Sequence, residues 1–223
     1  MTHVLREDII SASSEIADFS FIDSLQKRIS QFSGRITVSS RRGIKYQVLT
    51  HYIATNQLDF PLFTSDTGRL FQQTNAGWNS TLNRKEINFL SYYSYHISIA
   101  HYSKTKGLKA FYASIDDRKE CCFLSKAENR KRALTGKAVC LTALRAAQSL
   151  KRQNVDWLKW EESKHLIKLN PLWHRNTEEV LPINYTINIP NHQLHDQGFV
   201  RIVCKPSNPA INSREVFSLW TYC

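Results

Sequence analysis

The chain has 223 residues, a formal net charge of +11 and 42% hydrophobic residues, with only 7 Gly and 6 Pro. This composition excludes long disordered or low-complexity segments and allows either one large domain or two small ones. No apolar run approaches the roughly 18 residues of a membrane span. The first ten residues carry acids where a signal peptide needs a basic and then an apolar stretch, so we expect a cytoplasmic protein that does not contact a membrane.

The first part of the chain predicts mixed elements. Apolar residues at helical spacing predict a broken helix or a helical pair over residues 5–33, and this segment is slightly acidic. Residues 35–40 predict a strand and residues 44–53 a second helix. Asp66-Thr67-Gly68 lies between two apolar runs and predicts the turn of a hairpin. The same tripeptide occurs in aspartic proteases, whose chemistry needs two such carboxylates, so we favour a plain turn.

The middle of the chain is strongly basic. Residues 84–95 predict a helix and 97–102 a strand. Residues 104–152 then hold 13 Lys/Arg and 4 Asp/Glu, a local net charge of +9, with aromatic residues interleaved. Within this basic segment, 108–126 predict a β-hairpin and 138–152 a helix. Such a cluster of cations attracts a phosphate backbone, because each contact releases condensed counterions.

The C-terminal part is neutral and predicts three short strands at 183–189, 199–204 and 215–222, separated by Pro and Asn turns. We therefore expect an α+β fold with a helical N-terminal part, a central basic β-hairpin plus helix, and C-terminal antiparallel strands. The predicted division is a basic part over 1–152 and a small β-rich part over 153–223, with one continuous domain as the alternative.

The cysteines predict free thiols rather than a metal centre or a disulfide framework. Five of them occur without even spacing, which is typical of a reducing compartment. Cys121 and Cys122 are adjacent, and in the predicted strand their side chains point to opposite faces. We therefore expect no metal site and no cofactor.

One catalytic alternative remains, a Mg²⁺-dependent nuclease. Glu162-Ser163-Lys164 has the spacing of an acid and a lysine in such enzymes, with Asp156 as the upstream carboxylate. An acid two residues before a lysine also arises readily by chance, so we favour a charged surface turn. A further alternative is a basic protein-interaction module, such as an inhibitor or a toxin partner.

Three stretches resemble a known family. They are PLFTSDTGRLF (61–71), AFYASIDDRKECCFLSK (110–126) and the Ala- and Leu-rich stretch over 138–150. In their order they resemble the large (Cas8-like) subunit of type IV CRISPR effector complexes. Residues 35–80 contain no cysteine, so no zinc ribbon is expected. The resemblance implies a non-enzymatic subunit that contacts guide RNA and the duplex beside the target.

The sequence thus predicts a nucleic-acid-binding subunit of a larger ribonucleoprotein, with RNA or DNA and other protein subunits as partners and no catalysis. The residues predicted to contact nucleic acid are mainly Lys and Arg of the basic segment and of a second patch after the first strand: Arg41, Arg42, Lys45, Lys104, Lys106, Lys109, Arg118, Lys119, Lys126, Asn129, Arg130, Lys131, Arg132 and Lys137.

Overall fold

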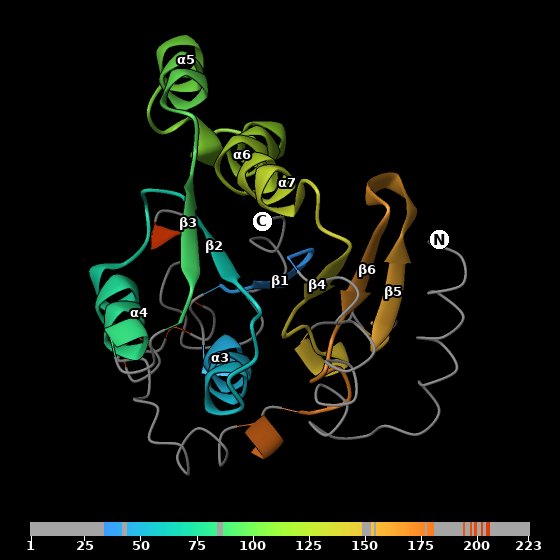
Figure 1. The fold of residues 1–223 in the computed structure, drawn as a ribbon. Coiled ribbons are helices and arrows are strands. Elements are labelled where there is room, and N and C mark those ends of the chain that lie inside the picture. The colour runs from blue at the N-terminus through green and yellow to red at the C-terminus, as the bar shows by residue number, and fades with distance from the viewer. Residues whose placement is uncertain are drawn as a thin grey trace.

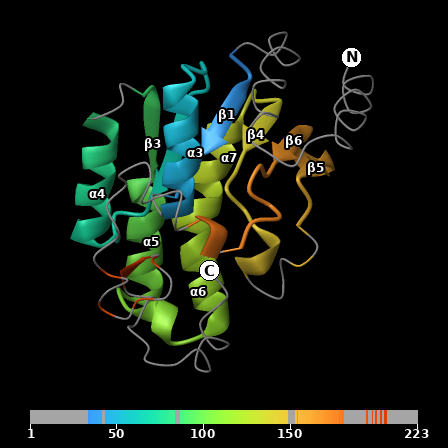
Figure 2. The same ribbon diagram turned by 90° about the horizontal axis from the view of Figure 1, so that it is seen from below.

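The computed structural model describes residues 34–41, 44–83, 87–148, 153, 155–176, 178–180, 194, 197, 199, 202, 204 and 205. A six-stranded sheet forms its centre, with helices on both faces (Figures 1 and 2). The strands are β1 (Ile36–Ser39), β2 (Leu62–Asp66), β3 (Phe89–Tyr93), β4 (Val139–Leu141), β5 (Leu158–Glu161) and β6 (Leu166–Leu169). The α-helices are α3 (Ile44–Thr55), α4 (Gln72–Asn83), α5 (His96–Lys106), α6 (Ile115–Cys122) and α7 (Glu128–Leu134).

The sheet is mostly parallel. Its strand order is β3-β2-β1-β4-β6-β5, and only β5 runs antiparallel, to β6. The chain therefore builds β1, β2 and β3 outward on one side, then returns to place β4 on the other side of β1. In such a sheet the carboxyl ends of the parallel strands lie at one edge, and the change of direction falls between β1 and β4.

The burial of the central strands β1 and β4 on both faces explains why such short segments are extended. All residues of β1 and β4 are buried, as expected for central strands covered on both faces. On one face, α3 and α4 pack Leu49 and Trp78 onto the larger core cluster. On the other face, α7 packs Ala133 and Leu134 against Phe63 and Cys140.

The fold class is α/β, which corrects the prediction of an α+β protein built around antiparallel strands. The strand at 35–40 and the helix at 44–53 are confirmed as β1 and α3. The predicted central hairpin is wrong, because this stretch folds as a short 3₁₀ turn (Ala110–Tyr112), α6, a π-helical turn (Phe123–Ala127) and α7. Ser114 caps α6 by accepting from the backbone N–H of Asp117, a signal that marks a helix start.

Three neighbouring predictions are also wrong. The sequence predicts a helix over 138–152, but the structure has the strand β4 at its start. β4 is extended because it pairs with β1 on one side and β6 on the other. Within 84–95 the structure has β3, while the strand predicted at 97–102 lies inside α5. The turn at Asp66 is confirmed, since Asp66 Oδ1 accepts from Gly68 N at 2.9 Å, but β2 continues into α4 instead of a hairpin.

Other predictions fall outside the described residues, namely the helices at 5–33 and the strands at 183–189 and 215–222, with most of 199–204. β6 pairs with β4, so strands from both predicted parts lie in one sheet. The division at residue 152 itself stays a prediction. Among the described helices, none is both long and apolar enough to cross a membrane.

Candidate functional site at the carboxyl edge of the sheet

The strand exits beside the change of chain direction form the candidate site. Val38 of β1 pairs with Leu141 of β4, so the ends of these two strands lie side by side, and the chain leaves the sheet at Ser40 and at Thr142. Ligands of open α/β sheets bind outside the carboxyl ends of the strands at this switch point. The chemistry of the site is therefore set by the residues that come directly after β1, β4 and their neighbouring strands.

The exit of β1 leads quickly into a helix. Ser40 is buried and its backbone N–H donates to Phe63 O at 2.7 Å, while the side chain of Arg41 is exposed. Helix α3 then begins at Ile44 and has no acidic residue in its first turn. A helix start presents unpaired backbone N–H groups and a positive partial charge, so this exit suits an anion.

The exit of β4 is fixed by buried side chains. Thr142 Oγ1 donates to Asn170 Oδ1 at 2.5 Å, and Asn170 Nδ2 donates to Asp156 O at 2.7 Å. Arg145 comes three residues later, buried except for about 3% of its surface, and its Nη1 lies 3.4 Å from Arg175 O. Burial lowers the pKa of Arg145, while Glu179 acts in the opposite direction. The guanidinium nevertheless stays charged at neutral pH.

A third exit, after β2, brings two thiols to one loop. Cys204 Sγ donates to Thr67 Oγ1 at 3.3 Å, and Arg69 Nη1 lies 4.0 Å from Cys121 Sγ. The Arg69 guanidinium also stacks over the Phe111 ring, 5.1 Å from its centroid. Residues far apart in the chain thus meet at Thr67 to Arg69, again at the carboxyl edge.

The cysteines differ in environment. Cys121 and Cys122 lie on α6, so the argument that a strand separates their side chains is wrong. Cys122 is disulfide-bonded, so the prediction of free thiols is wrong for this residue, and its Sγ lies 3.7 Å from Lys126 Nζ. Cys140 is fully buried in β4, and burial raises the pKa of its thiol to about 11, which makes it unreactive at neutral pH. Within the described residues, no three His, Cys, Asp or Glu side chains form a metal site, and the expectation of no metal stays a prediction.

The predicted contact residues of the basic segment have different environments in the structure. Lys104, Lys109 and Lys131 are exposed, whereas Arg118 is buried and its Nε donates to Phe111 O. Asn129 is fully buried and donates to Ser125 O, which excludes the predicted contact with a base. The remaining predicted cations have local roles: Lys106 and Lys119 form ion pairs, Lys126 lies near Cys122, Arg130 is half-buried near Cys140, Arg132 stacks on Tyr95, and Lys137 donates to Gly34 O.

The other predicted residues lie in different settings. Arg41 lies at the candidate site, Arg42 lies outside the described residues, and the side chain of Lys45 on α3 is not described. The runner-up nuclease residues Asp156, Glu162 and Lys164 are all exposed, and Lys164 Nζ pairs with Glu161, not with Glu162. No shared metal position for these carboxylates is found among the described residues.

Comparisons with known proteins identify relatives that share this sheet. The model of the phosphoadenosine phosphosulfate reductase domain matches residues 35–210, which include every strand of the sheet. The adenosine 5'-phosphosulfate reductase of Rhizobium meliloti (strain 1021) is 33% identical over 187 residues, covering 84% of this chain and 71% of the relative. That of Allochromatium vinosum is 33% identical over 180 residues, covering 81% and 70%.

Solved structures support the fold. The phosphoadenylyl-sulfate reductase of Candida auris, in a phosphate complex, superposes with a TM-score of 0.67 at 23% identity, covering 86% of this chain and 98% of that one. The FMN adenylyltransferase of Candida glabrata, in complex with FAD and pyrophosphate, gives 0.55 at 13% identity, covering 79% and 57%. At these identities the likeness concerns the fold alone.

These matches overturn the predicted identity and function. The resemblance to a CRISPR subunit is wrong, because the family model and the relatives identify a reductase domain. The relatives are named as enzymes acting on a small nucleotide, so the prediction of a non-catalytic protein that binds RNA or DNA within a ribonucleoprotein is also wrong, as are its nuclease and interaction-module alternatives. Among the missed residues, Thr142 and Arg145 carry one usable signal, because they follow the apolar run 138–141. Ser40 follows Ser39 and the run before Asn170 contains Lys168, so these two carry no such signal.

Proposed function

Because the chain belongs to the phosphoadenosine phosphosulfate reductase domain family, we propose that it is an oxidoreductase that binds and reduces an adenosine phosphosulfate. The substrate is a nucleotide with a sulfate joined to its 5'-phosphate. Its anionic end suits the switch point between β1 and β4, where the start of α3 and the buried Arg145 both favour negative charge.

The observation that carries this proposal is the placement of Arg145. A buried guanidinium is costly to desolvate and is found where it meets a defined partner or ligand. Here it lies shortly after β4, next to the switch point, and the family match includes it. Backbone N–H groups at α3 act on the opposite side, so the two exits complement the charge of one ligand.

In the proposed reaction, the S–O bond to the phosphate oxygen breaks, and the nucleotide monophosphate leaves with that oxygen. The sulfur takes up two electrons and leaves as sulfite, while a dithiol reductant loses two electrons and two protons and becomes a disulfide. Cys140 does not contribute, because its pKa of about 11 keeps it a buried thiol. The thiols described at the carboxyl edge are Cys121 and Cys204.

The proposal is tested by measuring sulfite and nucleotide monophosphate released from adenosine 5'-phosphosulfate by the full chain with a dithiol reductant. Equal amounts of the two products, abolished in Arg145→Met, are expected. A parallel titration with the product nucleotide measures binding alone. No binding by the folded wild-type chain would contradict the placement of the site, and binding without sulfite formation would contradict the reductase assignment.

A further inference from the structure

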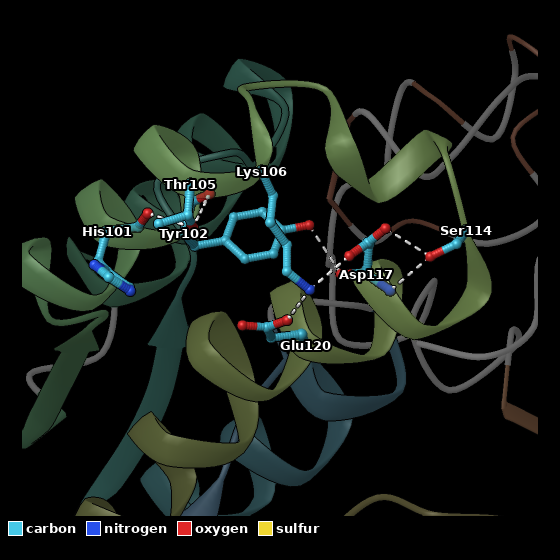
Figure 3. A network of polar contacts seen from close by, with 7 residues as sticks. All are labelled: His101, Tyr102, Thr105, Lys106, Ser114, Asp117 and Glu120. Atoms are coloured by element: carbon cyan, nitrogen blue, oxygen red, sulfur yellow. Dashed lines mark hydrogen bonds and ion pairs between the residues drawn. The ribbon is translucent and has the colours of Figure 1, made fainter.

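A polar network joins α5 to α6 (Figure 3), and Cys121 comes directly after Glu120, one of its members. Lys106 Nζ, near the end of α5, donates to Asp117 Oδ1 at 2.7 Å and to Glu120 Oε2 at 2.6 Å. These two acids are three residues apart on α6 and therefore share one face of that helix. A single cation thus bridges two helices through two carboxylates, and we call this contact the Lys106 clamp.

Buried and capping contacts reinforce the clamp. Tyr102 is almost fully buried, and its hydroxyl donates to Asp117 O at 2.9 Å. Ser114 accepts from the backbone N–H of Asp117 at 3.0 Å and donates to Asp117 Oδ2 at 2.6 Å. Asp117 is therefore held through its side chain, its N–H and its carbonyl, which fixes the first turn of α6 against α5.

Two residues of α6, Cys121 and Arg118, are linked to Arg69, the first directly and the second through Phe111. Cys121 comes directly after Glu120 and lies four residues after Asp117, and its sulfur is 4.0 Å from Arg69 Nη1. Arg118, also on α6, donates to the carbonyl of Phe111 at 3.1 Å, and the Phe111 ring stacks on the Arg69 guanidinium. A shift of α6 would therefore move both contacts of Arg69 at once.

At its C-terminal end, α6 does not continue as a regular α-helix. A π-helical turn, Phe123–Ala127, begins directly after Cys122. A π turn breaks the regular i to i−4 hydrogen bonding and is frequent at functional sites. Cys121 is held from both sides, by the Lys106 clamp before it and by the π-helical turn after it, where Ser125 Oγ donates to Cys121 O at 2.6 Å.

We propose that Lys106 is a positioning residue that acts through α6 to hold Cys121 and Phe111 against Arg69 at the carboxyl end of β2. The inference rests on the proposed function in one respect, namely that this edge is where the nucleotide is reduced. Lys106 does not touch the β1–β4 switch point in this arrangement. Its loss should therefore lower turnover while leaving nucleotide affinity nearly unchanged.

The test compares Lys106→Met with two variants in the full chain. Lys106→Arg keeps a cation that can reach both acids. Lys119→Met is the matched control, because Lys119 pairs with Asp116 within α6 and, among the described residues, forms no ion pair with a second helix. The rate of Cys121 alkylation is measured by tandem mass spectrometry of the peptide over residues 120–126, and sulfite formation is measured in parallel.

In Lys106→Met we expect Cys121 to alkylate about fivefold faster, because α6 loses its tie to α5 and the contact between Cys121 and Arg69 opens locally. We expect kcat to fall about tenfold with KM changed less than about twofold, since misplacement of groups at a site lowers the rate of the bound complex. Lys106→Arg should restore both values, and Lys119→Met should match the wild type.

Unchanged alkylation in a folded Lys106→Met chain would overturn the proposal, and so would equal changes in Lys119→Met. Should far-UV circular dichroism show that Lys106→Met is unfolded, Glu120→Gln, which removes one of the two acceptors, takes its place with the same expectations. If the wild type forms no sulfite, the proposed function fails, whereas the alkylation comparison still supports or overturns the clamp.

Discussion

The exits of β1 and β4 flank the same switch point but present positive charge in different ways. After β1 the charge comes from the start of α3 and from the exposed Arg41, which solvent screens. After β4 it comes from the buried Arg145, close to the Thr142–Asn170 hydrogen bond. The charge at the β1 exit is thus exposed and screened by solvent, whereas the charge at the β4 exit is buried and rigidly held.

The difference assigns separate tasks to the two exits. Backbone N–H groups at a helix start accept anions of several shapes, so the β1 exit attracts and holds charge. A buried guanidinium with a fixed plane recognises a particular arrangement of oxygen atoms, so in the proposed binding mode the β4 exit sets the pose of the ligand. Substitutions at the β4 exit should therefore have the larger effects.

The largest effect is expected for Arg145→Met. Loss of a desolvated, charge-assisted contact should weaken nucleotide binding by about 100-fold. Isothermal titration with adenosine monophosphate and with adenosine 5'-phosphosulfate measures this loss, and Lys159→Met, exposed on the edge strand β5, is the control. An unchanged dissociation constant in a folded variant would remove Arg145 from the binding site.

The next effect is expected for Thr142→Val, which removes the hydroxyl that donates to Asn170 and leaves the buried Asn170 oxygen without that donor. We expect a loss of about 1–3 kcal/mol in the free energy of unfolding, measured in urea, and about tenfold weaker binding. Thr37→Val is the matched control, because Thr37 is equally buried but donates to Pro61 O before β2, away from the exits. It should lose stability and keep affinity. Equal loss of affinity in both variants would mean that the effect is general softening of the sheet.

The contrast between regions also explains how far the sequence could predict the fold. β1 and α3 were predictable, because a β-branched run and a helical repeat stand next to each other in the chain. The stretch 138–141, AVCL, reads as part of an Ala- and Leu-rich helix. It becomes a strand because β1 and β6 pair with it from either side, and such long-range pairing leaves no mark in the local sequence.

The site was harder to predict for the same reason. Thr142 and Asn170 are 28 residues apart, and Arg69 and Cys121 are 52 residues apart, so only the folded sheet brings each pair together. The excess of Lys and Arg was real but misleading as a sign of nucleic acid. Lys106 bridges two acids, Arg118 binds a carbonyl, and Arg132 stacks on Tyr95, so much of the charge serves packing of helices.

A smaller effect is expected for Arg41→Ala at the β1 exit. Because Arg41 is exposed, its contribution is screened, and we expect about threefold to tenfold weaker nucleotide binding at low salt. The difference from the wild type should nearly vanish at about 1 M salt, where the screening length is roughly 3 Å. A loss that persists at high salt would show that Arg41 becomes desolvated in the complex, and the two exits would then be alike.

The smallest effect concerns Cys140, which reports whether the β4 exit is as rigid as its burial indicates. Burial raises the pKa of this thiol from 9.0 to about 11, so its thiolate is disfavoured in the folded state. The stability gained by keeping the neutral thiol is fully present below pH 9 and is lost as pH rises through about 11. The stability of the wild type relative to Cys140→Ala should therefore decrease between these values. At pH 8 Cys140 should resist alkylation until the chain unfolds globally. Alkylation at pH 8 in a chain that circular dichroism shows to be folded would mean that β4 opens locally, and Arg145 would then lack the rigid support from which its specificity derives.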